Sequence, residues 1–274
     1  MFSLLPHSFR FPACPRTLLL SLALMLAASL SARSLVRADM QLANNAVLAM
    51  YQDEDANMWI GTYDGLHLYN GKNTFVFRME LDNEFSLCSN IVLEIVPAEK
   101  GYLWVATSLG INKFSLRERR VVESYMQYVD VENIVSDSAG NTVLFSGEDF
   151  VSCYRPDRAF FEDVYMPGVR AAEIIAVWSE APGEFSSLDR NGLLVRYRLN
   201  DGDGKSLVRA SWRQLSAHPV SKAFFDGGKL HFVDTSGVLW RYTCGDGALA
   251  MLSDLSQLGE TGYTVSTVLS LIHI

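Results

Sequence analysis

The chain has 274 residues, of which 49% are hydrophobic, and its 31 acidic residues outnumber 23 basic ones, giving a formal net charge of −8. An acidic chain repels the phosphate backbone of nucleic acids and anionic membrane surfaces, so we expect neither as a partner. The four cysteines contain no C-x-x-C pair, which removes the usual basis for a zinc site or a dithiol redox centre.

The first 38 residues are predicted to be a secretory signal peptide. They contain four arginines and no acidic residue, followed by an apolar run over 18–30 and an exit at Val36-Arg37-Ala38. The run is shorter than the roughly 20 residues of a membrane-spanning helix, which favours cleavage over retention as an anchor. Without this segment, 19 basic residues face 31 acidic ones, a net charge of −12. We expect the three remaining cysteines to be buried apolar side chains, although an oxidising compartment would permit one disulfide.

The segment after the signal peptide alternates apolar and polar residues with period two, which predicts strands. We expect strands at 47–51, 58–62, 65–69 and 74–77, separated by turns rich in Asp, Asn and Gly. Gly65 follows an aspartate, a pairing that favours a tight hairpin because glycine accepts positive φ.

This strand pattern recurs at a fixed interval of 45 residues. The recurring residues are Asn45, Trp59, Thr62, Gly65 and Tyr69, which return as Asn90, Trp104, Thr107, Gly110 and Phe114. Further on, Gly192 and Tyr197 of DRNGLLVRY return as Gly237 and Tyr242 of DTSGVLWRY, again 45 residues apart. A degenerate copy lies at 138–154, and 262–268 has the pattern of the first strand of a sixth unit.

Four antiparallel strands in a repeat of about 45 residues are typical of a β-propeller blade. We therefore predict an all-β, incomplete propeller over 39–268, with blades near 44–80, 88–125, 130–165, 170–210 and 215–255. The wedge between neighbouring blades needs bulky side chains, for which we expect Trp59 and Trp104, with Phe145, Phe185 and Phe232 as smaller substitutes. The final residues 269–274 match the translation of a transposon-end sequencing adapter, so we expect them to be artefact and the natural protein to continue.

The first unit reads N-x-V…D-x-x-x-x-x-W-I-G-T-x-x-G-L-x-x-Y. The residues that carry this pattern are Asn45, Val47, Asp53, Trp59, Ile60, Gly61, Thr62, Gly65, Leu66 and Tyr69. The pattern resembles the two-component-regulator propeller repeat of the periplasmic sensor regions of Bacteroidetes hybrid two-component histidine kinases. The likeness is strong over 44–125 and weak over 130–268, and the second copy departs from it with Ala106 and Ile111 in place of Gly61 and Leu66.

The resemblance implies a larger receptor with two seven-bladed propellers, a β-sandwich, a membrane helix and a histidine kinase, dimeric in its full-length form. It implies a periplasmic propeller that senses oligosaccharides to regulate glycan utilisation, in a protein anchored in the inner membrane. No kinase motif is present in this chain. The alternatives are a secreted carbohydrate-binding or scaffolding propeller and a propeller-fold polysaccharide lyase or hydrolase.

Sequence patterns for catalysis or cofactor binding are weak, so we expect no catalytic site, metal or cofactor in this chain. Gly202–Ser206 lacks the upstream glycine of a phosphate-binding loop, and the series from Asp201 lacks the ligands of a calcium loop. The histidines have no partner at metal-ligand spacing.

Propellers usually bind ligands on the face that carries the turns between the second and third strands and the links between blades. On that face, the predicted oligosaccharide contacts are Tyr63, Asp64, Asn83 and Phe85, which offer aromatic rings with carboxylate and amide groups. The competing interpretation is that these residues only close turns.

Overall fold

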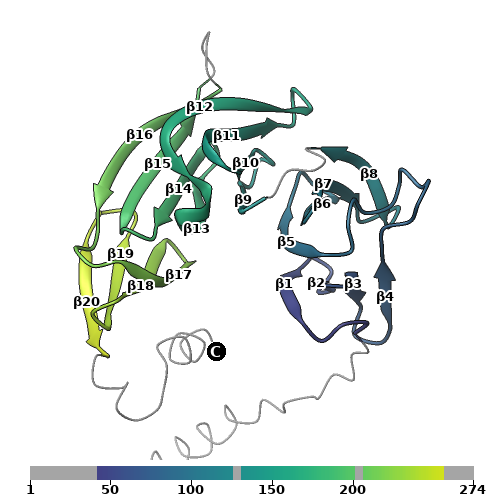
Figure 1. The fold of residues 1–274 in the computed structure, drawn as a ribbon, viewed down its shortest axis with the longest axis horizontal. Coiled ribbons are helices and arrows are strands. Elements are labelled where there is room, and N and C mark those ends of the chain that lie inside the picture. The colour runs from purple at the N-terminus through teal and green to yellow at the C-terminus, as the bar shows by residue number, and fades with distance from the viewer. Residues whose placement is uncertain (1–41, 126–130, 201–205, 256–274) are drawn as a thin grey trace, which may run out of the picture. The chain divides into compact units, whose positions relative to one another are not determined.

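The computed structural model describes residues 42–125, 131–200 and 206–255 (Figure 1). All of them belong to one compact unit that begins at Met40. The predicted signal peptide, the expected start of a sixth unit at 262–268 and the predicted adapter-derived residues at 269–274 lie outside the described ranges.

The described residues form five antiparallel sheets of four strands, and in each sheet the strands pair in the order of the chain. Blade 1 consists of β1 (Val47–Gln52), β2 (Met58–Thr62), β3 (Gly65–Tyr69) and β4 (Thr74–Phe77). Blade 2 consists of β5 (Val92–Pro97), β6 (Tyr102–Thr107), β7 (Gly110–Ser115) and β8 (Arg120–Tyr125). Blade 3 consists of β9 (Asn133–Ser136), β10 (Thr142–Phe145), β11 (Glu148–Arg155) and β12 (Phe160–Arg170).

Blade 4 consists of β13 (Ile174–Ala181), β14 (Glu184–Asp189), β15 (Leu193–Leu199) and β16 (Leu207–Gln214). Blade 5 consists of β17 (Val220–Asp226), β18 (Lys229–Asp234), β19 (Val238–Thr243) and β20 (Leu249–Asp254). The helix in the described residues is a single 3-10 turn, η1 (Ala171–Glu173). The predicted all-β propeller of about five blades is confirmed.

The two repeated tryptophans occupy equivalent places. Trp59 lies three residues before Thr62, which pairs with Gly65, and Trp104 lies three residues before Thr107, which pairs with Gly110. Both indoles are buried, and each packs against an aromatic ring of the following blade. The 45-residue repeat is therefore a repeat of structure as well as of sequence.

Aromatic contacts join consecutive blades. The ring centroids lie 5.4 Å apart for Trp59 and Phe114, 4.8 Å for Trp104 and Tyr154, and 5.7 Å for Phe145 and Tyr197. In each pair, a residue of the second strand of one blade meets a residue of the third strand of the next. Such edge-to-face pairs contribute about 0.5 to 1.5 kcal/mol beyond the area that they bury.

Phe185 and Phe232 also fill the wedge-shaped gaps between blades, but their rings point in the opposite direction. Phe185 packs in the cluster between blades 3 and 4, and Phe232 in the cluster between blades 4 and 5, so each faces the preceding blade. Phe145, like the two tryptophans, faces the following blade. Successive side chains in a strand point to opposite faces of the sheet. A large side chain that is shifted by one residue along the strand therefore faces the preceding blade instead of the following one.

In blades 1 and 3, an aspartate closes the turn between the first and second strands. Asp53 accepts hydrogen bonds from the amide of Asn57 (2.9 Å) and from the Trp59 indole (2.8 Å). Burial alone would raise the pKa of Asp53, but these hydrogen bonds hold it below its ordinary value. Asp137 of blade 3 closes the same kind of turn, and its Oδ2 also accepts the amide of Gly183 in blade 4 (2.6 Å).

The three described cysteines, Cys88, Cys153 and Cys244, are free thiols, and the latter two are buried. Burial raises the pKa of the Cys153 thiol to about 11. The expectation that they act as apolar side chains agrees with this burial, and no disulfide joins them.

Two ionisable side chains lie between blades 2 and 3. Lys113 is buried, forms an ion pair with Glu99 and donates to the Tyr154 hydroxyl (3.0 Å). Glu94 of β5 accepts the backbone amide of Ile134 in β9 (3.2 Å), and burial raises its pKa to about 7. A buried carboxyl of this kind favours the protonated form.

Replacing Trp104 by alanine should lower the free energy of unfolding by about 3 to 5 kcal/mol, because it opens a cavity between blades 2 and 3. Urea unfolding followed by circular dichroism measures the change. Met50→Ala is the control, since Met50 is 66% exposed and should change stability by no more than about 0.5 kcal/mol. Equal effects of the two substitutions would contradict the wedge role of the indole.

Glu94→Gln should stabilise the protein at pH 8 and leave it nearly unchanged at pH 4.5. The folded state raises the pKa of Glu94, so the wild type loses stability as pH rises from about 4.5 to about 7. Glutamine removes that loss, which we expect to amount to about 2 to 4 kcal/mol at pH 8. Unfolding curves at pH 4.5, 6 and 8 test the prediction, and a difference independent of pH would contradict it.

Candidate functional site

The four predicted contact residues lie at two places on blades 1 and 2. Tyr63 and Asp64 form the turn between β2 and β3, and Asn83 and Phe85 lie in the link between β4 and β5. Asn83 and Phe85 help to line a pocket of about 370 Å³, whose lining also includes Arg78 and Arg120. Tyr63 and Asp64 do not line it.

Three of these four side chains are engaged within the chain. The Asp64 carboxylate receives two hydrogen bonds of 3.0 Å from Arg78, which lower its pKa. Asn83 donates to Glu80 (2.7 Å) and accepts from the amide of Phe85 (3.0 Å).

The Phe85 ring is covered by the guanidinium of Arg120, which lies 4.1 Å from the ring centroid. Tyr63 is 52% exposed. Asp64 and Asn83 are therefore held by loop contacts and Phe85 by a cation–π contact, and the role of all four residues in ligand binding stays a prediction.

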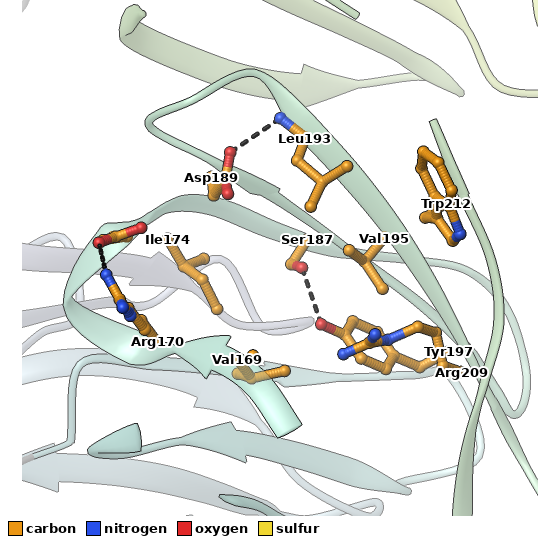
Figure 2. Close-up of a pocket in the computed structure, with 12 residues that line it drawn as sticks. Val169, Arg170, Ile174, Ser187, Asp189, Leu193, Val195, Tyr197, Arg209 and Trp212 are labelled. Atoms are coloured by element: carbon orange, nitrogen blue, oxygen red, sulfur yellow. Dashed lines mark hydrogen bonds and ion pairs between the residues drawn. The ribbon is translucent and has the colours of Figure 1, made fainter. Parts of the chain in front are cut away.

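A second pocket, of about 320 Å³, lies between blades 3 and 4 (Figure 2). Its inner part is lined by apolar side chains, Val169, Ile174, Val195 and the ring of Tyr197, and its rim is charged or aromatic. Pockets that bind small molecules combine an apolar lining with a few placed polar groups and have volumes from about 300 Å³ upward.

Blade 3 supplies one wall through the end of β12. Gly168 there has φ +84°, and its amide donates to the carboxylate of Asp149 (2.6 Å). Only glycine adopts such a φ readily. The following residue, Val169, lines the pocket. Arg170 follows at the rim, where it pairs with Glu173 of η1 at 3.0 Å.

Blade 4 supplies the opposite wall through a β-bulge in its outer strand. In β16, Arg209 pairs with Tyr197 and Trp212 pairs with Val195, while Ala210 is the extra residue between them. Two residues that are three apart in the sequence would ordinarily point to opposite faces of a strand. The bulge places Arg209 and Trp212 on the same face, toward the pocket (Figure 2).

Polar groups from the same blade reach the pocket. The Asp189 carboxylate accepts the amide of Leu193 (2.8 Å), and burial raises its pKa. Ser187 and Tyr197 share a hydrogen bond between their hydroxyls (3.1 Å), and burial raises the pKa of the Tyr197 phenol. The site can thus present an acceptor, hydroxyls and a guanidinium around an apolar floor.

The sequence signalled only part of this pocket. Tyr197 belongs to the recurring aromatic series, and Asp189 recurs 45 residues later as Asp234. Arg209 and Trp212 were missed, because no repeat of the blade motif includes them. A tryptophan among basic and small residues in R-A-S-W-R was the available signal.

Within the described part of the chain, no three histidine, cysteine or acidic side chains are grouped so that they could hold a metal ion. The segment 201–205, where the imperfect phosphate-loop and calcium-loop patterns fall, lies outside the described residues. In the ranges that the structure covers, no helix has the length and apolar character that crossing a bilayer requires.

Comparison with family models matches residues 41–64 to the two component regulator propeller. This part of the chain is similar to a two component regulator propeller repeat. The match covers β1, β2 and the turn that follows, and so includes Trp59 and Asp64. A search of curated proteins returned no match.

Solved structures with the same fold include extracellular domains of bacterial hybrid two component systems. The extracellular domain of BT4673, assigned to the hybrid two component systems of B. thetaiotaomicron, aligns with a TM-score of 0.57 and 15% identity over 77% of this chain. That of BT3049, from the same organism and the same kind of system, aligns with a TM-score of 0.56 and 18% identity over 76%. YCF48 bound to D1 peptide aligns with a TM-score of 0.55 and 12% identity, over 80% of this chain and 71% of that one.

The chain spans about 30% of the length of each of the two sensor domains that it matches. Identities at this level establish the shared propeller fold. The suspected resemblance to two-component-regulator propellers is confirmed by the family match together with these neighbours.

Trp212→Phe should remove most of the quenching of protein fluorescence by iodide. Trp212 is 68% exposed, whereas Trp59, Trp104 and Trp178 are buried and Trp240 is partly buried. Iodide reaches exposed indoles most readily, so the remaining fluorescence should be quenched much less. Stern–Volmer plots of the two proteins give the comparison, and an unchanged slope would show that Trp212 is covered.

Proposed function

We propose that this chain is part of the extracytoplasmic, ligand-sensing propeller region of a hybrid two-component sensor histidine kinase, and that the sensor responds to oligosaccharides in the periplasm. One observation carries the proposal: a two component regulator propeller repeat opens a fold shared with extracellular domains of hybrid two component systems. The signal peptide predicted from residues 1–38 agrees with export.

The pocket between blades 3 and 4 supports a ligand-binding role. Its apolar floor is ringed by the Trp212 indole, the Asp189 carboxylate and the Arg209 guanidinium. Groups of this kind suit a ligand that has both apolar faces and many hydroxyls.

Sensing requires that the ligand bind one signalling state better than another. A ligand held between two blades can do so if the states differ in how those blades are packed, and a differential affinity of a few kcal/mol is enough to shift the populations. In the proposed sensor, that shift passes to the kinase.

A secreted binding propeller is the second candidate. YCF48, whose structure was determined with a bound peptide, has the same fold, so the fold alone suits a binding module without a kinase. No observation on the described residues favours the lyase or hydrolase alternative.

The test uses the full-length protein in lipid nanodiscs with radiolabelled ATP. In the proposed sensor, at least one pool of plant, host or microbial oligosaccharides should change the rate of histidine phosphorylation severalfold, and calorimetry should show binding of the same pool. Oligosaccharide binding to a protein that has no kinase activity would favour the secreted module. Phosphorylation that no pool alters would contradict the proposed ligand class.

A further inference from the structure

The most exposed tryptophan of the described residues lies at the rim of the pocket between blades 3 and 4. Trp212 is 68% exposed, although an indole of this size ordinarily buries most of its surface. Its neighbour across the strand pair is Val195, which lines the pocket floor. The indole therefore borders the cavity and leaves a broad apolar surface available to a ligand.

The bulge at Ala210 brings a guanidinium to the same side as this indole. Arg209 uses one nitrogen, Nη2, to donate to the carbonyl of Pro167 across the gap between the blades (3.0 Å). A guanidinium has five N–H donors, and no described carboxylate forms an ion pair with Arg209. Its remaining donors are therefore available to a ligand in the pocket.

An acceptor faces these donors from the blade 4 turn. Asp189 is at the pocket wall, where its carboxylate accepts the amide of Leu193 and hydrogen bonds from the backbone and side chain of Asn191. An ionised carboxylate has about four acceptor sites, so one remains for a ligand hydroxyl. The hydroxyl pair of Ser187 and Tyr197 lies deeper and can both donate and accept (Figure 2).

The charges at the rim balance. Arg170 is neutralised by Glu173 at 3.0 Å, and Arg209 is matched by Asp189 within the same lining. An anionic ligand would gain from one guanidinium but would meet an additional carboxylate, whereas a neutral ligand with hydroxyls can donate to Asp189 and accept from Arg209. The lining therefore favours a neutral polyhydroxylated ring with one apolar face.

We propose that the pocket between blades 3 and 4 binds a neutral hexopyranose unit of an oligosaccharide. The C–H face of the sugar stacks on Trp212, and its hydroxyls contact Arg209 and Asp189. This assignment rests on the proposed oligosaccharide-sensing function and adds to it a binding site and a class of sugar. Because the pocket has walls from two blades, the sugar joins blade 3 to blade 4.

The test is calorimetric titration of the full-length protein with matched sugar pairs. Each pair contains a neutral trisaccharide and its uronic acid counterpart, for example galactotriose and trigalacturonate, or cellotriose and its glucuronate analogue. Binding of one neutral trisaccharide should weaken by at least about tenfold in Trp212→Ala, while Trp212→Phe, which keeps an aromatic face, should retain most of the affinity. Arg209→Lys should weaken it as well, because it keeps the charge but loses the planar fork.

Phe160→Ala is the matched control, since Phe160 is an exposed aromatic residue (50%) of β12 that does not line the pocket. It should bind as the wild type does, and thermal unfolding should show that all variants fold. Affinity of Trp212→Ala within about twofold of the wild type would overturn the assignment and leave the sensing function standing.

Two further outcomes would also overturn it. Loss of binding in Phe85→Ala but not in Trp212→Ala would place the ligand at blades 1 and 2 instead. Tighter binding of the uronic acid member of each pair would refute the neutral sugar class. If the wild type binds none of the trisaccharides, both the assignment and the proposed oligosaccharide ligand are wrong.

Discussion

The structure depends on aromatic packing between consecutive blades. A four-stranded sheet has two faces and cannot bury either one alone, so each blade is stable only against its neighbours. The same contact joins three successive pairs of blades: a ring of the second strand packs against a ring of the third strand of the next blade. The pairs are Trp59 with Phe114, Trp104 with Tyr154, and Phe145 with Tyr197.

Two ionisable side chains between blades 2 and 3 have partners there. Lys113 lies among the rings of Tyr102 and Trp104 but meets the Glu99 carboxylate, and Glu94 accepts an amide of the next blade. The interface between blades 3 and 4 contains a pocket with an apolar floor and a polar rim. An interface that is incompletely filled is a natural place for a ligand, since the ligand can complete packing that the chain leaves open.

The sequence predicted the sheets better than it predicted the site. Alternation over 47–77 and the 45-residue offset were enough to predict β1 to β4 and the equivalence of Trp59 and Trp104, because both follow from local periodicity. The faces of Phe185 and Phe232 were not predicted, since a shift of one residue along a strand reverses the side chain. The position of Arg209 and Trp212 on one face of β16 was not predicted either, because the extra residue Ala210 becomes apparent only in the register of β15 with β16.

The double role of Asp137 has a consequence for how such a repeat diversifies. Its carboxylate closes its own turn and also receives the amide of Gly183 from the neighbouring turn. An insertion or deletion in either turn would separate donor from acceptor and remove this contact between blades 3 and 4. The turns at this end differ in length between copies, from 137–141 in blade 3 to 182–183 in blade 4. The links at the opposite end differ more, from 78–91 between blades 1 and 2 to 171–173 between blades 3 and 4. New specificities can therefore arise there by insertion without disturbing the stacking of the sheets.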